Sequence, residues 1–118
     1  MTTELDWEQT LFTLILHAGN ARSKAKEAAE LAESGDWDGA QACLADADAE
    51  QLKAHEVNAN IIRLEAGGGS VPISVLLLHA MDLLALAWSE QDYTQQYVGM
   101  CKRVKVLEAE VAALKANS

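Results

Sequence analysis

Apolar side chains recur every three or four residues along most of the chain, which is the spacing of one face of an α-helix. In the first third of the chain this face comprises Trp7, Leu11, Leu14, Ala18, Ala21, Ala25, Ala28 and Leu31. The spacing predicts a helix over residues 4–34. Gly19 interrupts the pattern without ending it, because an isolated glycine costs a helix only about 1 kcal/mol relative to alanine.

Two turn signals divide the pattern. Ser34-Gly35-Asp36 closes the first helix and opens a second over residues 36–66, with Gly35 suited to a left-handed cap and Asp36 to an N-cap. Because this connection is short, the two helices must form an antiparallel hairpin. The apolar stripe expected on the second helix comprises Leu44, Ala47, Leu52, His55, Ala59 and Ile62. Gly67–Gly69 forms the second turn, and Pro72 is placed for the first position of a helix over 72–116.

The third helix differs from the other two, because nearly every residue from Val71 to Trp88 is apolar and must be covered on more than one side. Steps of three and four then alternate through Leu76, His79, Leu83, Leu86, Glu90, Tyr93, Tyr97, Met100, Val104, Leu107, Val111 and Leu114. This is a heptad seam, and residues 90–118 form a heptad-patterned tail continuous with the third helix. The seam predicts self-association and leaves open whether two, three or four strands associate.

Together these patterns predict one all-α domain, 1–118, built as an antiparallel three-helix bundle with a long third helix. The apolar run is too short for a membrane span and carries two ionisable groups, so no membrane insertion is expected. Eighteen acidic against nine basic residues give a net charge of −9, which argues against nucleic acid as a partner. The N-terminus carries no secretory signal and the two cysteines lie far apart, so a cytoplasmic location is expected.

His79 and Asp82 are the candidate functional pair, because residues three apart project from one helical face. An imidazole is a usable nucleophile near neutral pH, and a carboxylate within an apolar run needs a partner or a metal ion. A packed structural histidine is the alternative at this point. His55 is expected to fix the geometry between helices or to support the site by a hydrogen bond. His17, on the apolar face of the first helix, is expected to be structural.

Short motifs in a fixed order then identify a family. Gly19-Asn20-Ala21-Arg22-Ser23, the turn at 32–36, the Ala54-His55 step, Pro72-x-Ser74-Val75 and His79-Ala80-Met81-Asp82 follow one another within residues 10–85. They resemble the lactose/cellobiose-type enzyme IIA family of the sugar phosphotransferase system. The chain departs from the family pattern at Met81, where the family has Gln, and at Leu83, where it has His.

The resemblance implies a homotrimer in which His79 receives phosphate from the HPr phosphocarrier protein and passes it to the IIB component, as a phosphohistidine relay. It also implies that Asp82 lies near a divalent cation such as Mg²⁺ on the trimer axis. Three carboxylates converging on an axis repel one another unless a cation or a proton relieves the charge. The alternative hypothesis is a structural or engineered oligomerisation module on the same trimeric scaffold, with phosphotransfer lost.

Overall fold

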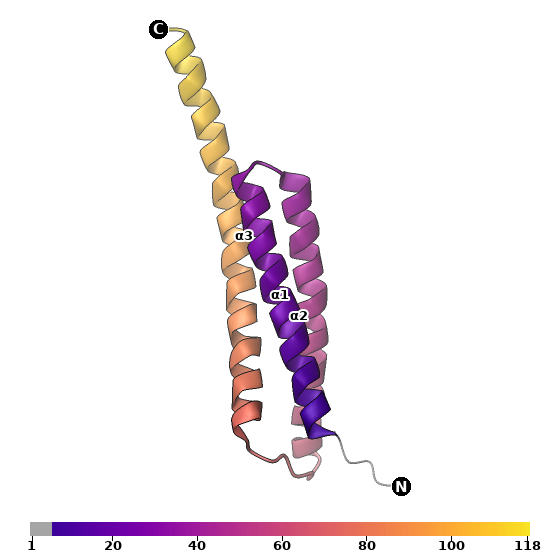
Figure 1. The fold of residues 1–118 in the computed structure, drawn as a ribbon. Coiled ribbons are helices and arrows are strands. Elements are labelled where there is room, and N and C mark those ends of the chain that lie inside the picture. Colours follow the sequence, from indigo (N-terminus) through magenta and orange to yellow (C-terminus); the bar gives the residue numbers. More distant parts are fainter. Residues whose placement is uncertain (1–5) are drawn as a thin grey trace.

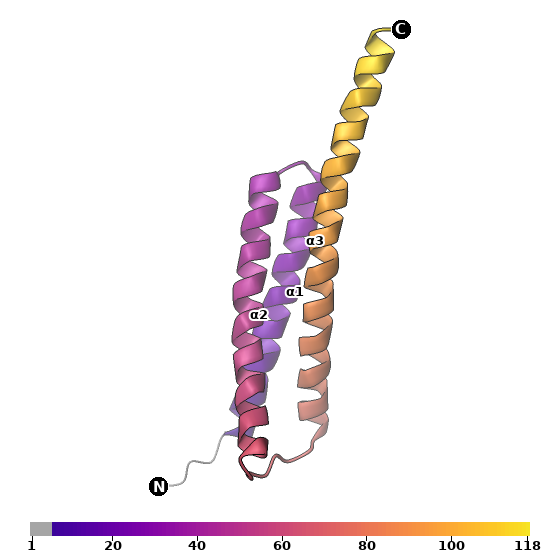
Figure 2. The same cartoon turned by 180° about the vertical axis from the view of Figure 1, so that it is seen from behind.

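The computed structural model describes residues 6–118 and contains three helices, α1 (Trp7–Glu33), α2 (Trp37–Ala66) and α3 (Val75–Ala116). Figures 1 and 2 show them running antiparallel in one elongated bundle, with α3 extending well past the α1–α2 connection. α1 packs closely on both of the other helices, whereas α2 and α3 pack less closely on each other. The predicted all-α bundle with a long third helix is confirmed.

The helix ends follow local side-chain chemistry. The backbone N–H of Gln9 donates to the Asp6 carboxylate, and that of Gly39 donates to the Asp36 carboxylate, so each aspartate is an N-cap. Between α1 and α2, Gly35 has a φ of 85°, which is the left-handed conformation expected of it. α1 therefore begins after its cap at Asp6, and residue 5 and those before it lie outside the described residues.

The start of α3 differs from the prediction. The Ser74 side chain accepts a hydrogen bond from the backbone N–H of Leu77, so Ser74 is the N-cap and α3 begins at Val75. Pro72 lies in the connection before the cap and does not occupy the first position of the helix. The physical reason is that a hydroxyl on Ser74 satisfies an otherwise unpaired N–H of the first turn, which Pro72 cannot do.

The core consists of a leucine-rich part and an alanine-rich part. Near the α2–α3 connection, the buried cluster comprises Leu11, Leu14, Ala54, Ile61, Leu77, Ala80 and Leu84. Toward the α1–α2 connection, it comprises Ala28, Ala32, Ala40, Cys43, Leu44 and Val98. Small side chains there allow the helices to approach closely, and burial raises the pKa of the Cys43 thiol. Cys101 packs at the edge of the same cluster, and both thiols are free.

The apolar stripe predicted for the second helix is wrong in part. Leu44 and Ala47 are buried, but Leu52 is 60% exposed, Ile62 is 57% exposed, and His55 is also exposed. The buried line of α2 instead comprises Ala40, Cys43, Leu44, Ala47, Gln51, Ala54 and Ile61. The polar residue Gln51 occupies a core position in this line, which a pattern of apolar residues could not indicate.

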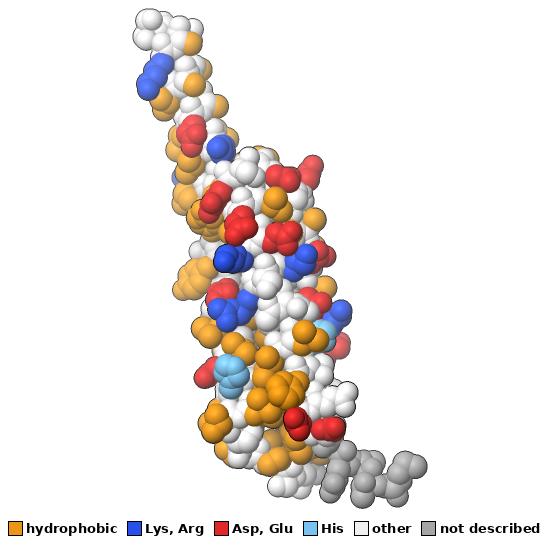
Figure 3. Space-filling view, viewed as in Figure 1, with side chains coloured by type: hydrophobic (Ala, Val, Ile, Leu, Met, Phe, Trp, Pro, Cys, Tyr) orange, Lys and Arg blue, Asp and Glu red, His pale blue; other side chains and the backbone are white. Residues whose placement is uncertain are grey.

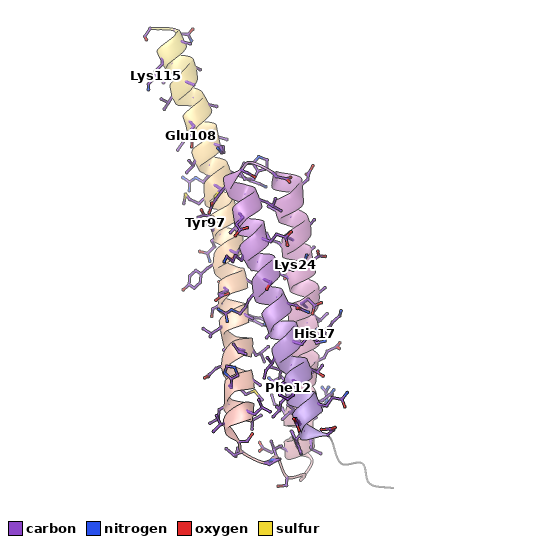
Figure 4. All side chains as sticks on the ribbon, in the orientation of Figure 1. Phe12, His17, Lys24, Tyr97, Glu108 and Lys115 are labelled. Atoms are coloured by element: carbon purple, nitrogen blue, oxygen red, sulfur yellow. The ribbon has the colours of Figure 1, made fainter. Side chains whose placement is uncertain are left out.

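The end of α3 projects beyond the bundle. Figure 4 shows Glu108 and Lys115 on a stretch of α3 that extends past the ends of α1 and α2, and every residue from 102 to 118 is exposed. The molecule is consequently 78 Å long and only 21 Å across. In Figure 3 acidic side chains gather over the upper part of the bundle and hydrophobic ones over its lower part and along α3. Among the described residues, no helix is long and apolar enough to cross a membrane.

Candidate functional site

After the Ser74 cap, His79 lies on the second turn of α3 and Asp82 on the third. Both side chains are exposed. Within residues 6–118, His17 is the one histidine engaged in a side-chain hydrogen bond, so the His79 imidazole keeps both nitrogens free for chemistry. Exposed apolar residues surround this end of α3: Ile73 is 75% exposed, Val75 84% and Leu78 57%. A free imidazole in an exposed apolar surface is suited to reaction with another protein.

The outward face of α3 passes through Asp82. Its exposed apolar members are Leu78, Leu86, Tyr93, Met100, Val104, Leu107, Val111 and Leu114, and we call this line, with Asp82 in it, the α3 seam. Leu76 and Leu83, which the heptad pattern also assigned outward, are partly buried against the bundle's own core. At 3.6 residues per turn, Asp82 is therefore central to the seam at this level and His79 lies at its edge toward α1.

The two departures from the family pattern are packing positions. Met81 is partly buried against the leucine-rich cluster, and Leu83 packs against Ala18, Ala21 and Ala87. Neither side chain shares the exposed surface of His79 and Asp82. The apolar residues at 81 and 83 therefore contribute to the core of this chain.

Arg22, from the Gly19–Ser23 motif, is bound to α3. Its Nε and Nη2 donate to the two carboxylate oxygens of Glu90 at 3.0 and 2.8 Å. This bidentate hydrogen bond raises the pKa of Arg22. It explains why Glu90 interrupts the predicted heptad seam: its carboxylate turns toward α1 and is paired within the same chain.

A surface groove lies beside this ion pair, between α1 and α3. It has a volume of about 610 Å³ and is lined by Gly19, Arg22, Ser23, Glu90, Tyr93 and Tyr97 among others. A Cβ added at Gly19 would meet no atom of the described residues within 4 Å, so no contact among them requires glycine there. The groove borders the α3 seam through Tyr93, which belongs to both.

His17 joins α1 to α2. Its Nδ1 lies 2.5 Å from Oε2 of Glu50, and Asn20 donates to the same oxygen. The hydrogen bond with His17 lowers the pKa of Glu50. Figure 4 places His17 on the side of α1 that faces α2. This histidine therefore has the interhelical role expected of it.

His55 lies on another side of the bundle from His79. Its ring centroid is 5.9 Å from that of Trp88, with the planes tilted by 52°. Trp88 follows His79 by nine residues, which is two and a half turns, so the two project from opposite sides of α3. Within one chain the structure brings His79 and Asp82 together but does not bring His55 to them.

One chain supplies a single carboxylate at the seam. Within residues 6–118, no group of three or more His, Cys, Asp or Glu side chains is close enough to hold a metal ion. The described residues therefore provide no cluster of ligand side chains around Asp82 within one chain.

Two relationships in this region were missed by sequence reasoning. The sequence did contain an indication of the Arg22–Glu90 pair, since a lone acid within an apolar seam needs a cation and Arg22 belongs to a conspicuous motif. The contact between His55 and Trp88 had none, because residues 33 positions apart meet only through the rotation of two helices about their axes.

The site thus consists of an exposed, unengaged histidine on a helical bundle, and comparison with known proteins gives the family of the chain. Residues 9–102 match the model of the family described as PTS system, Lactose/Cellobiose specific IIA subunit. The lichenan-specific phosphotransferase enzyme IIA component of Bacillus subtilis (strain 168) is 37% identical over 99 residues, which cover 84% of this chain and 90% of that protein. The lactose-specific EIIA component of Lacticaseibacillus casei is 32% identical, covering 92% and 96%.

A solved structure agrees with the sequence relatives. The PTS cellobiose-specific enzyme IIA from Bacillus anthracis superposes with a TM-score of 0.83 at 36% identity, covering 90% of this chain and 94% of that one. The chain therefore belongs to the lactose/cellobiose-specific IIA subunit family of the sugar phosphotransferase system. Its function is that of a IIA phosphocarrier component. The predicted family and function are confirmed.

Proposed function

We propose that His79 is the residue that carries the phosphoryl group, accepting it from HPr and passing it to a IIB component in the cytoplasm. The observation that carries this proposal is the state of the imidazole: His79 is exposed, whereas His17 is bonded to Glu50 and His55 lies against Trp88. A neutral imidazole nitrogen can attack the phosphorus directly, and the donor's nitrogen leaves as the new bond forms. The apolar surface formed by Ile73, Val75 and Leu78 is suited to contact with both protein partners.

We further propose that three copies assemble around the α3 seam. An unpartnered line of large apolar side chains along a whole helix is an aggregation liability unless other copies cover it. The α1–α3 groove beside the seam, open at Gly19, can accept a neighbouring α3. Three seams meeting at one axis bring three Asp82 carboxylates together and leave each His79 in the cleft between two subunits. Hard cations prefer such carboxylate oxygens, and we propose that Mg²⁺ binds there.

In the projecting tail, the charges flanking the seam agree with a parallel assembly. When Val104 and Val111 are heptad a positions, Arg103 and Glu110 are g positions, and Glu108 and Lys115 are e positions. In parallel strands a g residue faces the e residue five positions later on the neighbour. Arg103 then faces Glu108 of the next copy, and Glu110 faces Lys115, so both pairs attract.

The experiment is phosphoryl transfer from HPr that has been labelled with radioactive phosphate. Wild-type chain is expected to take up acid-labile label, and His79→Ala to take up none while keeping its helical content. His55→Ala and His17→Ala are the matched controls, because each removes an imidazole outside the seam. A supporting role for His55 would slow labelling in His55→Ala without abolishing it. Label that persists in His79→Ala would contradict the assignment, and absence of label on the wild type would favour the oligomerisation module.

A further inference from the structure

A second surface groove, between α2 and α3, is not used by the phosphocarrier site. We call it the α2–α3 groove; it has a volume of about 270 Å³ and is lined by Asp48, Gln51, His55, Trp88, Gln91 and Asp92, among others. It lies between the two helices that pack least closely on each other. The side chains that line it come from facing turns of the two helices.

One wall of the groove is aromatic and open to solvent. The Trp88 side chain is 57% exposed, and the His55 ring lies beside it at a centroid separation of 5.9 Å. Indole is the aromatic group that binds cations most strongly over its face. An exposed tryptophan at the edge of a concave surface therefore provides a face on which a ligand can stack.

The groove is negatively charged. Its lining includes two acidic residues, Asp48 and Asp92, and no Lys or Arg. Neither aspartate is in an ion pair within residues 6–118. Asp48 accepts a hydrogen bond from Gln91, and Asp92 accepts one from Gln96. No cation among the described residues thus pairs with either carboxylate, and the net charge of −9 adds to the attraction for cations.

The groove also contains a buried side-chain amide, that of Gln51, with unsatisfied polar atoms. Gln51 lines the groove and is only 5% exposed, and neither its Oε1 nor its Nε2 has a hydrogen-bond partner among residues 6–118. An unsatisfied buried amide is unfavourable, and proteins rarely keep one without a reason. Because both atoms are covered, a ligand reaches them only when a neighbouring lining side chain changes rotamer. A ligand with N–H donors would then give Oε1 its missing partner.

We infer that the α2–α3 groove binds a small organic cation that carries a guanidinium or ammonium group. Its charge is held between Asp48 and Asp92, its face or methylene groups stack on Trp88, and an N–H donates to Gln51. A neutral sugar could also stack on Trp88, but it would leave both carboxylates uncompensated. A bare metal ion does not suit the groove, because no group of three His, Cys, Asp or Glu ligands is present among the described residues.

The α2–α3 groove is separate from the two residues of the same chain that are proposed to carry the phosphoryl group and the cation. Trp88 lies on the opposite side of α3 from His79, so a ligand beside Trp88 is held away from the His79 imidazole of the same chain. A ligand bound there contacts neither His79 nor Asp82. Binding can therefore be measured on the unphosphorylated chain, and its outcome does not depend on that of the labelling experiment.

The test uses butylguanidinium and its neutral isostere butylurea as probes, on full-length chain labelled with ¹⁵N. The three tryptophans give three indole N–H signals, so Trp7 and Trp37 serve as internal controls for Trp88. Butylguanidinium is expected to shift the Trp88 signal saturably, with weaker binding at high salt because exposed charges are screened. Asp92→Asn should weaken binding about ten-fold, and Trp88→Leu, followed by calorimetry, by a similar factor.

Asp46→Asn is the matched control variant, because it makes the same Asp-to-Asn change at a residue of α2 that lines a different groove, between α1 and α2. It should change the affinity less than two-fold. The inference is overturned if butylguanidinium gives no saturable shift at Trp88, or if butylurea binds equally well. It is also overturned if cellobiose shifts Trp88 and butylguanidinium does not, or if Asp46→Asn weakens binding as much as Asp92→Asn. Unchanged circular dichroism of each variant shows that the fold is retained.

Discussion

Arg22 on α1 holds Glu90 on α3 through two parallel hydrogen bonds, at 3.0 and 2.8 Å, across 68 positions of sequence. The pair lies beside the α1–α3 groove, on the flank of the seam where a neighbouring copy is proposed to pack. The Glu90 carboxylate is directed toward α1 of its own chain, whereas an unpaired carboxylate at this position would face the neighbouring copy. The pair thus links the fold of one chain to its proposed assembly.

A double-mutant cycle measures this link. Arg22→Met and Glu90→Gln should each destabilise the chain, and their coupling should be below about 1 kcal/mol because both side chains are some 40% exposed (39% and 41%). Urea denaturation at one fixed protein concentration gives the values, since assembly makes stability depend on concentration. The Lys24–Glu27 pair, which is a single contact at 3.4 Å within one helix, is the control and should couple more weakly. Equal coupling in the two cycles would show that the bidentate geometry contributes nothing.

The fold could be predicted from the sequence largely because its turns are local. Gly35 and Asp36 indicate the first connection by their own conformational and capping preferences. In the structure Gly35 has a positive φ and Asp36 caps α2, as expected. The faces of α3 could not be predicted as well. Its inner line through Leu77 and Leu84 lies one residue from the heptad line through Leu76 and Leu83, so a one-residue difference decides which side chains face the bundle.

The candidate site could likewise be predicted only in part. His79 and Asp82 lie three apart on one helix, so their proximity follows from helical geometry. His55 could be placed on α2 but not on a particular side of the bundle, because that depends on how α2 rotates about its axis when Gln51 enters the core. The polar residues in the core were the part of the structure that an apolar pattern could not show.

Removal of the Asp82 charge should strengthen the proposed trimer when no metal is present. Three carboxylates at one axis repel, and Asp82→Asn removes that repulsion while keeping the side chain's shape. In EDTA the variant is expected to melt a few degrees above wild type, on the order of 1 kcal/mol. Adding Mg²⁺ should stabilise the wild type and leave Asp82→Asn unchanged. Asp92→Asn, on the same helix but away from the seam, is the control and should behave as wild type in both conditions.

The tail's charges should determine how tightly the copies associate. Lys115→Glu places two acids at the proposed Glu110–Lys115 contact, and the expected cost is on the order of 0.5 kcal/mol at each of three interfaces. The double variant Glu110→Lys/Lys115→Glu restores opposite charges and should recover association in sedimentation equilibrium. Lys105→Glu makes the same change at an outward position and is the control. Association that falls equally in Lys105→Glu and Lys115→Glu would mean that net charge alone matters, and no loss after truncation at Met100 would exclude a role for the tail.

The His17–Glu50 hydrogen bond should make stability fall in acid. The bond lowers the pKa of Glu50 below its ordinary value of 4.5, so the folded state favours the carboxylate more than the unfolded state does. This contribution is fully present above the unfolded pKa and is lost as the pH falls through the lower, folded pKa. The difference in unfolding free energy between wild type and Glu50→Gln should therefore be larger at pH 6 than at pH 3, as measured by urea denaturation at both pH values. Glu56→Gln, an exposed acid on the same helix, is the control, and a difference for Glu50→Gln that does not change with pH would contradict the assignment.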